Sequence, residues 1–187
     1  GYTDGWVKEA EKRGLLNLRS TVDCLPYYIK DENIRLFERH GVLSKTEVHA
    51  RYEIELENYY KQINIEALTM LDMIKKDILP ATAAYMKDLG AAALEKKQLG
   101  LGTGFEQSLL TEISGYADEL YAKAKELEND EENTPQSSDV LDIAKYYRST
   151  VFAQMEATRK PADKIESLVG SKYWPYPTYG ELLFSVV

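Results

Sequence analysis

The chain has 187 residues and a formal net charge of −8 at pH 7. This acidic balance argues against nucleic acids and anionic membrane surfaces as partners, because phosphate binding needs clustered Lys and Arg. The sequence contains no run of about 18 apolar residues, so it predicts no membrane span.

Residues 1–43 carry the signals of short helices joined by loops. Helix starts are favoured at Asp4, Thr21 and Asp31. Helix ends are favoured at Gly14 and Gly41. The second of these helices is expected to stop before Pro26. This part of the sequence predicts a compact N-terminal segment.

Residues 44–98 read as one long helix. Ser44 and Glu47 are spaced as a capping box, in which each side chain bonds the backbone N–H of the other residue. Apolar residues then recur in steps of three and four, at Tyr52, Leu56, Tyr59, Ile63, Ala67, Met70, Ile74, Ile78, Ala81, Tyr85 and Leu89. A second stripe widens this face, at Ile54, Ile65, Leu68, Leu71 and Leu79. Pro80 predicts a kink over residues 76–80.

Two further helices follow, separated by short turns. A glycine-rich turn at 99–104 leads to a helix over 105–129, for which Thr103 and Glu106 have capping-box spacing. An acidic loop is expected at 129–137, and Ser137 or Ser138 then caps a helix that runs to residue 169. Pro161 predicts a second kink in that helix. Short turns make successive helices antiparallel neighbours.

The C-terminal tail is rich in aromatic residues. Pro175 and Pro177 force an extended start, and Thr178 and Glu181 have the spacing of a third capping box for a short last helix. Its five aromatic residues are too dense to lie in water: Tyr173, Trp174, Tyr176, Tyr179 and Phe184. They pack on this chain's own bundle, or they form a docking strip for another domain or subunit, since aromatic residues anchor interfaces.

These elements add up to an all-α fold. We expect an antiparallel helical bundle built on one long kinked helix, with short N-terminal helices and an extended aromatic C-terminal tail. The predicted domains are residues 1–43 as the short-helix segment, 44–170 as the three-helix bundle, and 171–187 as the tail that packs back on it.

Residues that carry chemistry are few. His40 and His49 are the only histidines, and neither has a Glu three residues before it, as bundle metal sites use. The single cysteine, Cys24, forms no internal disulfide, which favours a reducing cytoplasm. No phosphate-binding glycine motif and no Ser–His–Asp arrangement is visible. We therefore expect no catalytic, cofactor-binding or metal-binding residue in this chain.

Several blocks of the sequence occur together, in this order, in a known family: residues 1–17, 36–42, 51–59, 63–81, 146–152 and 173–184. On these blocks the chain resembles the C-terminal region of type III glutamine synthetase, the large-subunit bacterial class. The block at 63–81 is the most specific, and residues 95–140 match more loosely.

The resemblance implies a parent enzyme that makes glutamine from glutamate, ammonia and ATP, with Mg²⁺ or Mn²⁺. It also implies a dodecamer of two hexameric rings, and an upstream catalytic domain of the same polypeptide as partner. No catalytic residue is carried over, so this piece alone is expected to be inactive and to serve subunit assembly and stability. A free-standing helical protein-interaction module is the alternative. A bundle enzyme with a metal or di-iron site fits poorly, because the ligands are too few.

Overall fold

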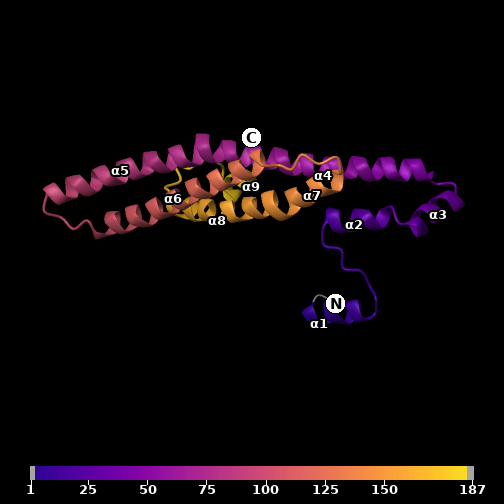
Figure 1. Cartoon of the computed structure of the whole chain (residues 1–187). Helices are drawn as coiled ribbons and strands as arrows, with labels where there is room; N and C mark the ends of the chain where they lie inside the picture. Colours follow the sequence, from indigo (N-terminus) through magenta and orange to yellow (C-terminus); the bar gives the residue numbers. More distant parts are fainter. Residues whose placement is uncertain (1–2, 185–187) are drawn as a thin grey trace. The chain divides into compact units, whose positions relative to one another are not determined.

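The computed structural model describes residues 3–184, without the side chain of Tyr179, and every regular element among them is helical (Figure 1). The predicted all-α fold class is therefore confirmed. In chain order the elements are α1 (Asp4–Lys12), α2 (Thr21–Tyr28), α3 (Asp31–Arg39), α4 (Lys45–Met73), η1 (Ile74–Ile78), α5 (Leu79–Gln98), α6 (Gly104–Glu132), α7 (Val140–Tyr146), η2 (Tyr147–Val151), α8 (Phe152–Leu168) and α9 (Tyr179–Phe184). The η elements are π-helical turns.

Backbone contacts divide the chain into two compact units. Unit 1 comprises Gly1–Gln62 and Pro135–Arg148, and unit 2 comprises Ile63–Thr134 and Ser149–Val187. The long helix contributes to both units. The predicted domain boundaries after residues 43 and 170 stay a prediction.

The core of unit 1 forms where α2, α4 and α7 bring apolar side chains together. Val22, Leu56 and Ala144 are buried at its centre, and the rings of Tyr60 and Tyr147 stack 5.6 Å apart at its edge. Partly buried residues cover this cluster: Leu25, Tyr52, Tyr59, Tyr60, Val140 and Leu141. Aromatic residues thus supply much of the area that this small core buries.

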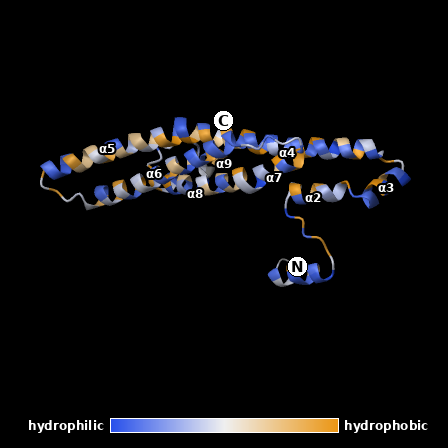
Figure 2. Cartoon of the chain, viewed as in Figure 1, coloured by the Kyte–Doolittle hydropathy of each residue, from blue (hydrophilic) through white to orange (hydrophobic). Residues whose placement is uncertain are grey.

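In unit 2, α6 packs against α5 on one side and α8 on the other (Figure 1). The core side chains come from α4, η1, α6, η2 and α8. They include Ile63, Ala67, Ile74, Ile78, Ile113, Leu120, Leu127, Val151, Met155 and Ile165. Figure 2 shows hydrophobic and hydrophilic residues alternating along α4 and α5, as expected for helices that bury one face.

The long helix runs without interruption through α4, η1 and α5, over 54 residues. Its predicted capping box is confirmed: the Ser44 N–H donates to Glu47 Oε2 at 2.7 Å, and the Glu47 N–H donates to Ser44 Oγ at 3.3 Å. The predicted kink region coincides with the π-helical turn η1, which ends two residues before Pro80. Pro80 has no backbone N–H to donate to the carbonyl of Lys76, and a widened turn commonly accommodates that loss.

The second apolar stripe of the long helix divides in the structure. Leu71 is buried, but Ile54, Ile65 and Leu68 are each more than half exposed. Among the described residues, the buried face of the long helix is therefore narrower than the sequence predicts. Part of the stripe remains available to other surfaces.

Several predicted helix ends are wrong. Ser20 rather than Thr21 caps α2, and Pro26 lies inside that helix. The side chains of Asp4 and Asp31 lie in the first turns of α1 and α3 and cap neither helix. These short polar side chains favour the first turn, next to the positive end of the helix dipole, as well as the cap position itself.

Errors of the same kind occur later in the chain. The predicted acidic loop begins too early, because α6 continues to Glu132, as the high helix propensity of Glu allows. Asp139, not Ser137 or Ser138, caps α7 by accepting from the Leu141 N–H at 2.9 Å. The helix α8 is uninterrupted through Pro161, and the π-helical turn η2 lies about ten residues earlier.

We predict that Pro80→Ala changes stability by less than about 1 kcal/mol. The restored hydrogen bond contributes about 1 kcal/mol, and the loss of proline's restriction of the unfolded chain costs about 0.4–1 kcal/mol. Thermal melts of the variant measure this. As a control, Ile78→Ala at a 6 % exposed position should cost about 2–5 kcal/mol. A loss for Pro80→Ala as large as that of the control would mean that proline itself holds the turn.

Candidate functional site

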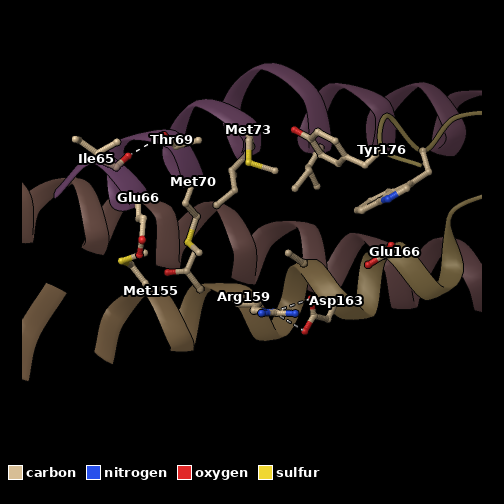
Figure 3. A pocket seen from close by; sticks show the side chains of 15 residues that line it. Ile65, Glu66, Thr69, Met70, Met73, Met155, Arg159, Asp163, Glu166 and Tyr176 are labelled. Atoms are coloured by element: carbon tan, nitrogen blue, oxygen red, sulfur yellow. Dashed lines mark hydrogen bonds and ion pairs between the residues drawn. The ribbon is translucent and has the colours of Figure 1, made fainter. Parts of the chain in front are cut away.

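An apolar groove lies in unit 2, between the α4–η1 segment and α8 (Figure 3). Its volume is about 520 Å³, within the range of about 300–1,000 Å³ that is usual for binding pockets. The apolar lining residues are Ile65, Met70, Met73, Ile74, Ile78, Met155, Ala162, Trp174 and Tyr176. In Figure 3, Met70 and Met73 of α4 and Met155 of α8 point into the space between the helices.

The π-helical turn η1 shapes one wall of this groove. Ile74 and Ile78 begin and end the turn, and both are buried. Residues four apart on an ordinary α-helix drift by about 40° around the axis. The wider turn reduces that drift, so both side chains remain on the inner face. Thr82, four residues further, is also buried and donates its hydroxyl to the Ile78 carbonyl at 2.7 Å.

The tail closes one end of the groove. Helix α8 ends at Leu168, Val169 is extended, and the Tyr173 N–H donates to the Gly170 carbonyl at 2.8 Å. A Cβ on Gly170 would lie 3.4 Å from the ring of Tyr85, which places the start of the tail in van der Waals reach of α5. The chain therefore turns back along the long helix directly after α8.

Two tyrosines anchor the tail on α5 and η1. The ring centroids of Tyr173 and Tyr85 lie 5.2 Å apart, and the Tyr173 hydroxyl donates to Asp88. The Tyr176 hydroxyl donates to Asp77 Oδ2 at 2.8 Å. Burial, and then this bond to a carboxylate, raise the pKa of Tyr176 to about 12. The neutral phenol is thus strongly favoured at this position.

Charged residues line the rim of the groove. Glu66 lies on α4, and Asp163 and Glu166 lie on α8, all three exposed. Among the described residues that line the groove, the one cation is Arg159, which pairs with Asp163 through its Nε at 3.3 Å (Figure 3). The rim is therefore predominantly negative.

Ion pairs connect the long helix to α6 at two places. Glu128 accepts from Lys75 and, at 2.9 Å, from Lys125. The bond from Lys75, and then that from Lys125, lower the pKa of Glu128 to about 2. At the far end of α5, Lys96 pairs with Glu106, whose side chain is buried. That pair explains why the predicted capping box of Thr103 and Glu106 is absent: the Glu106 carboxylate binds an ammonium group instead.

Large exposed apolar residues gather at the turn between α5 and α6. We call this set the hairpin tip: Leu94, Leu99, Leu101 and Phe105, with exposed fractions of 65 %, 75 %, 56 % and 68 %. Gly100 has φ +71°, the left-handed conformation that ends a helix tightly. Leu99 and Leu101 lie on the turn, and Leu94 and Phe105 lie on the helices that flank it. Exposed apolar side chains of this kind are commonly covered by other proteins.

Helix α1 in unit 1 is exposed in a different way. None of its residues is buried, and Trp6 is 42 % exposed. Residues 15–19 connect it to α2 without regular structure, and Leu15 and Leu16 are exposed there as well. Isolated helices shorter than about 12–15 residues are marginal in water. A nine-residue helix with no fully buried residue is therefore expected to need a further surface to pack on.

The residues predicted as an interface do not share one environment. Tyr173, Trp174 and Tyr176 are partly buried against unit 2, whereas Phe184 is 81 % exposed. The side chain of Tyr179 lies outside the described residues. The predicted third capping box holds: the Thr178 N–H donates to Glu181 Oε2 at 2.6 Å, and the Glu181 N–H donates to Thr178 Oγ1 at 3.2 Å. Docking by these residues stays a prediction.

The groove itself was not predicted. Of its methionines, the sequence pattern predicts Met70, as part of the apolar stripe of the long helix. The signal was present, because three of the chain's four methionines line this one surface. Methionine is a flexible gap-filler that is often used at adaptable binding surfaces.

The described residues contain neither a metal-binding cluster nor a helix that could cross a membrane. No cluster of three or more His, Cys, Asp or Glu side chains that could hold a metal ion occurs in that part of the chain. Within the same residues, every helix is too short or too polar to cross a membrane.

Comparison with known proteins gives consistent matches. A family model described as the glutamine synthetase C-terminal domain matches residues 1–97. A glutamine synthetase of Butyrivibrio fibrisolvens is 47 % identical over 188 residues, covering 100 % of this chain and 27 % of that protein. A type-3 glutamine synthetase of Dictyostelium discoideum is 30 % identical, over 98 % of this chain and 26 % of that protein. A glutamine synthetase of Bacteroides fragilis is 25 % identical, over 99 % and 26 %. The chain spans about a quarter of the length of these relatives.

We predict that the bond between Tyr176 and Asp77 couples the tail to the long helix. Tyr176→Phe and Asp77→Asn should each lower the free energy of unfolding by about 1 kcal/mol. The double variant should lose less than the sum, because both substitutions remove one interaction. Urea unfolding of the four proteins measures this cycle. Tyr121→Phe, at a tyrosine that is 56 % exposed, is the control and should be neutral. Strictly additive losses would contradict the coupling.

We also predict a pH-dependent contribution from Glu128. Its pKa falls from 4.5 to about 2 on folding, so the stabilisation is present above pH 4.5 and is lost as the pH falls towards 2. The stability difference between the wild-type chain and Glu128→Gln should therefore shrink from pH 6 to pH 3. Urea unfolding at several pH values measures it. Glu112→Gln, an exposed change on the same helix, should show no such trend.

Proposed function

Because this chain belongs to the glutamine synthetase C-terminal domain family, we propose that it is a non-catalytic helical domain that supports assembly and stability of a glutamine synthetase. Its partner in this proposal is the catalytic domain of the same polypeptide. The relatives that it matches are about four times as long as the chain, so a large partner is available.

The observation that carries the proposal is the exposure of α1. This nine-residue helix buries no residue, yet it presents Trp6 and is followed by exposed Leu15 and Leu16. Apolar surface of this kind stabilises by about 25 cal/mol per Å² when it is covered. The resemblance assigns residues 1–17 to the exit from the catalytic domain. We therefore propose that α1 and its linker pack against that domain.

The hairpin tip supports the assembly part of the proposal. Its four apolar side chains are more than half exposed, and the ion pair between Lys96 and the buried Glu106 joins the two helices that flank the turn. A fixed apolar surface loses little conformational entropy when it is covered, which favours its use as a contact between subunits.

The activity of the whole protein is part of the same proposal. By resemblance it is the ATP-dependent formation of glutamine from glutamate and ammonia, in a cytoplasmic dodecamer of two hexameric rings. We assign ATP and Mg²⁺ or Mn²⁺ to the rest of the polypeptide. This domain contributes no reacting group.

The test compares one substitution in two contexts, the 187-residue chain and the longer polypeptide that contains it. Trp6→Ala should change the melting temperature of the short chain little, because Trp6 is 42 % exposed there and its ring contacts Arg13 of the turn that ends the same helix. In the longer polypeptide it should lower the melting temperature by a few degrees, since burying a large side chain contributes about 1.5–3 kcal/mol. It should also shift the sedimentation profile towards smaller species.

Tyr121→Ala is the matched control, because Tyr121 is an exposed aromatic residue of α6. Tyr121→Ala should change neither the melting temperature nor the sedimentation profile of either protein. If Trp6→Ala has no effect on stability or assembly in the longer polypeptide, α1 does not dock there. The free-standing interaction module then becomes the better description of this chain.

A further inference from the structure

We propose that the apolar groove of unit 2 binds one basic amphipathic helix of a second protein. The groove, lined by α4–η1, α8 and the tail, is the surface described above. This inference is independent of the proposed assembly role, which uses α1 and the hairpin tip.

The dimensions of the groove fit a helix. Its lining residues extend over positions 65–78 on one wall and 155–166 on the other. At about 1.5 Å per residue these walls are roughly 16–20 Å long, which corresponds to three or four helical turns. The volume of about 520 Å³ accommodates several side chains from one face of such a helix. A helix laid in a groove is recognised through anchors at i, i+3 or i+4, and i+7.

The lining is adaptable and apolar. Met70, Met73 and Met155 face the groove, and Trp174 and Tyr176 close its end. Methionine side chains repack around different apolar anchors at low cost, and aromatic side chains provide large contact areas. The floor is rigid by comparison, because Ile74 and Ile78 are buried in the core.

The charges select a basic partner. Glu66, Asp163 and Glu166 border the groove, and the one lining cation, Arg159, is already paired with Asp163. A helix with Lys or Arg beside its apolar face would meet these carboxylates, and complementary charge accelerates and orients association. A second copy of this chain fits less well, because its net charge is −8.

Fluorescence of Trp174 reports on the groove directly. The chain has two tryptophans, so Trp6→Phe leaves Trp174 as the sole indole. The probe is a peptide of about 15 residues made of Leu and Lys, with leucines at helical spacing. Controls are the peptide with Glu in place of each Lys, and a Leu/Lys peptide of the same composition in scrambled order.

The Leu/Lys helix should shift the Trp174 emission with saturation at one peptide per chain. The Leu/Glu peptide and the scrambled peptide should each bind at least about tenfold more weakly, since they lack the complementary charge or the apolar face. Salt should weaken binding, because exposed charges are screened.

Two substitutions of equal charge separate groove binding from general attraction to an acidic protein. Glu166→Lys at the rim should weaken binding about fivefold or more. Glu112→Lys, at an exposed position of α6, should weaken binding less than about twofold. Circular dichroism checks that both variants remain folded. If Glu166→Lys unfolds the chain, Glu166→Gln replaces it, with Glu112→Gln as its control.

Three results would overturn the proposal. The first is no saturable change at Trp174, or equal binding of the Leu/Glu or scrambled peptide. The second is equal weakening by the rim variant and its control. The third is self-association of the chain, measured by sedimentation, that Glu166→Lys abolishes while Glu112→Lys does not, which would assign the groove to a second copy of this chain.

Discussion

The spacing of buried residues along the helices is the constraint on which the structure depends. Ile74, Ile78 and Thr82 are all buried and are separated by two steps of four. An α-helix turns about 100° per residue, so repeated steps of four carry a stripe away from the core. The π-helical turn at Ile74–Ile78 corrects this drift. The helix thereby remains continuous while its apolar face keeps contact with α6.

The second π-helical turn obeys the same rule. Tyr147, Val151 and Met155 are buried, again at steps of four, and the turn extends from Tyr147 to Val151. No proline lies within it, so here the widened turn accompanies the spacing of buried residues alone. Pro161 lies later in α8, is itself buried, and does not interrupt the helix. Proline and the spacing of buried residues are thus treated as separate influences on helix widening. Among the described residues, the two occur together near Pro80.

The sequence predicts local features of this fold better than contacts between distant residues. The capping boxes at Ser44 and Thr178 form as predicted, because both partners lie within four residues. The box at Thr103 fails because Lys96, on the preceding helix, takes the carboxylate of Glu106. No pattern around Thr103 reveals that competition. The aromatic residues of the tail differ in environment for a similar reason. Tyr173 contacts Tyr85 and Asp88, whereas Phe184 is exposed among the described residues.

The exposed apolar surfaces differ in chemistry, and this difference argues for different partners. The hairpin tip consists of aliphatic and aromatic side chains at a turn whose flanking helices are joined by the ion pair of Lys96 and Glu106, which suits a flat, fixed contact between subunits. The groove combines methionines with a negative rim, which suits one elongated, basic occupant. A domain used only to hold subunits together would need the first surface and not the second. The groove is therefore the feature that assembly alone does not explain.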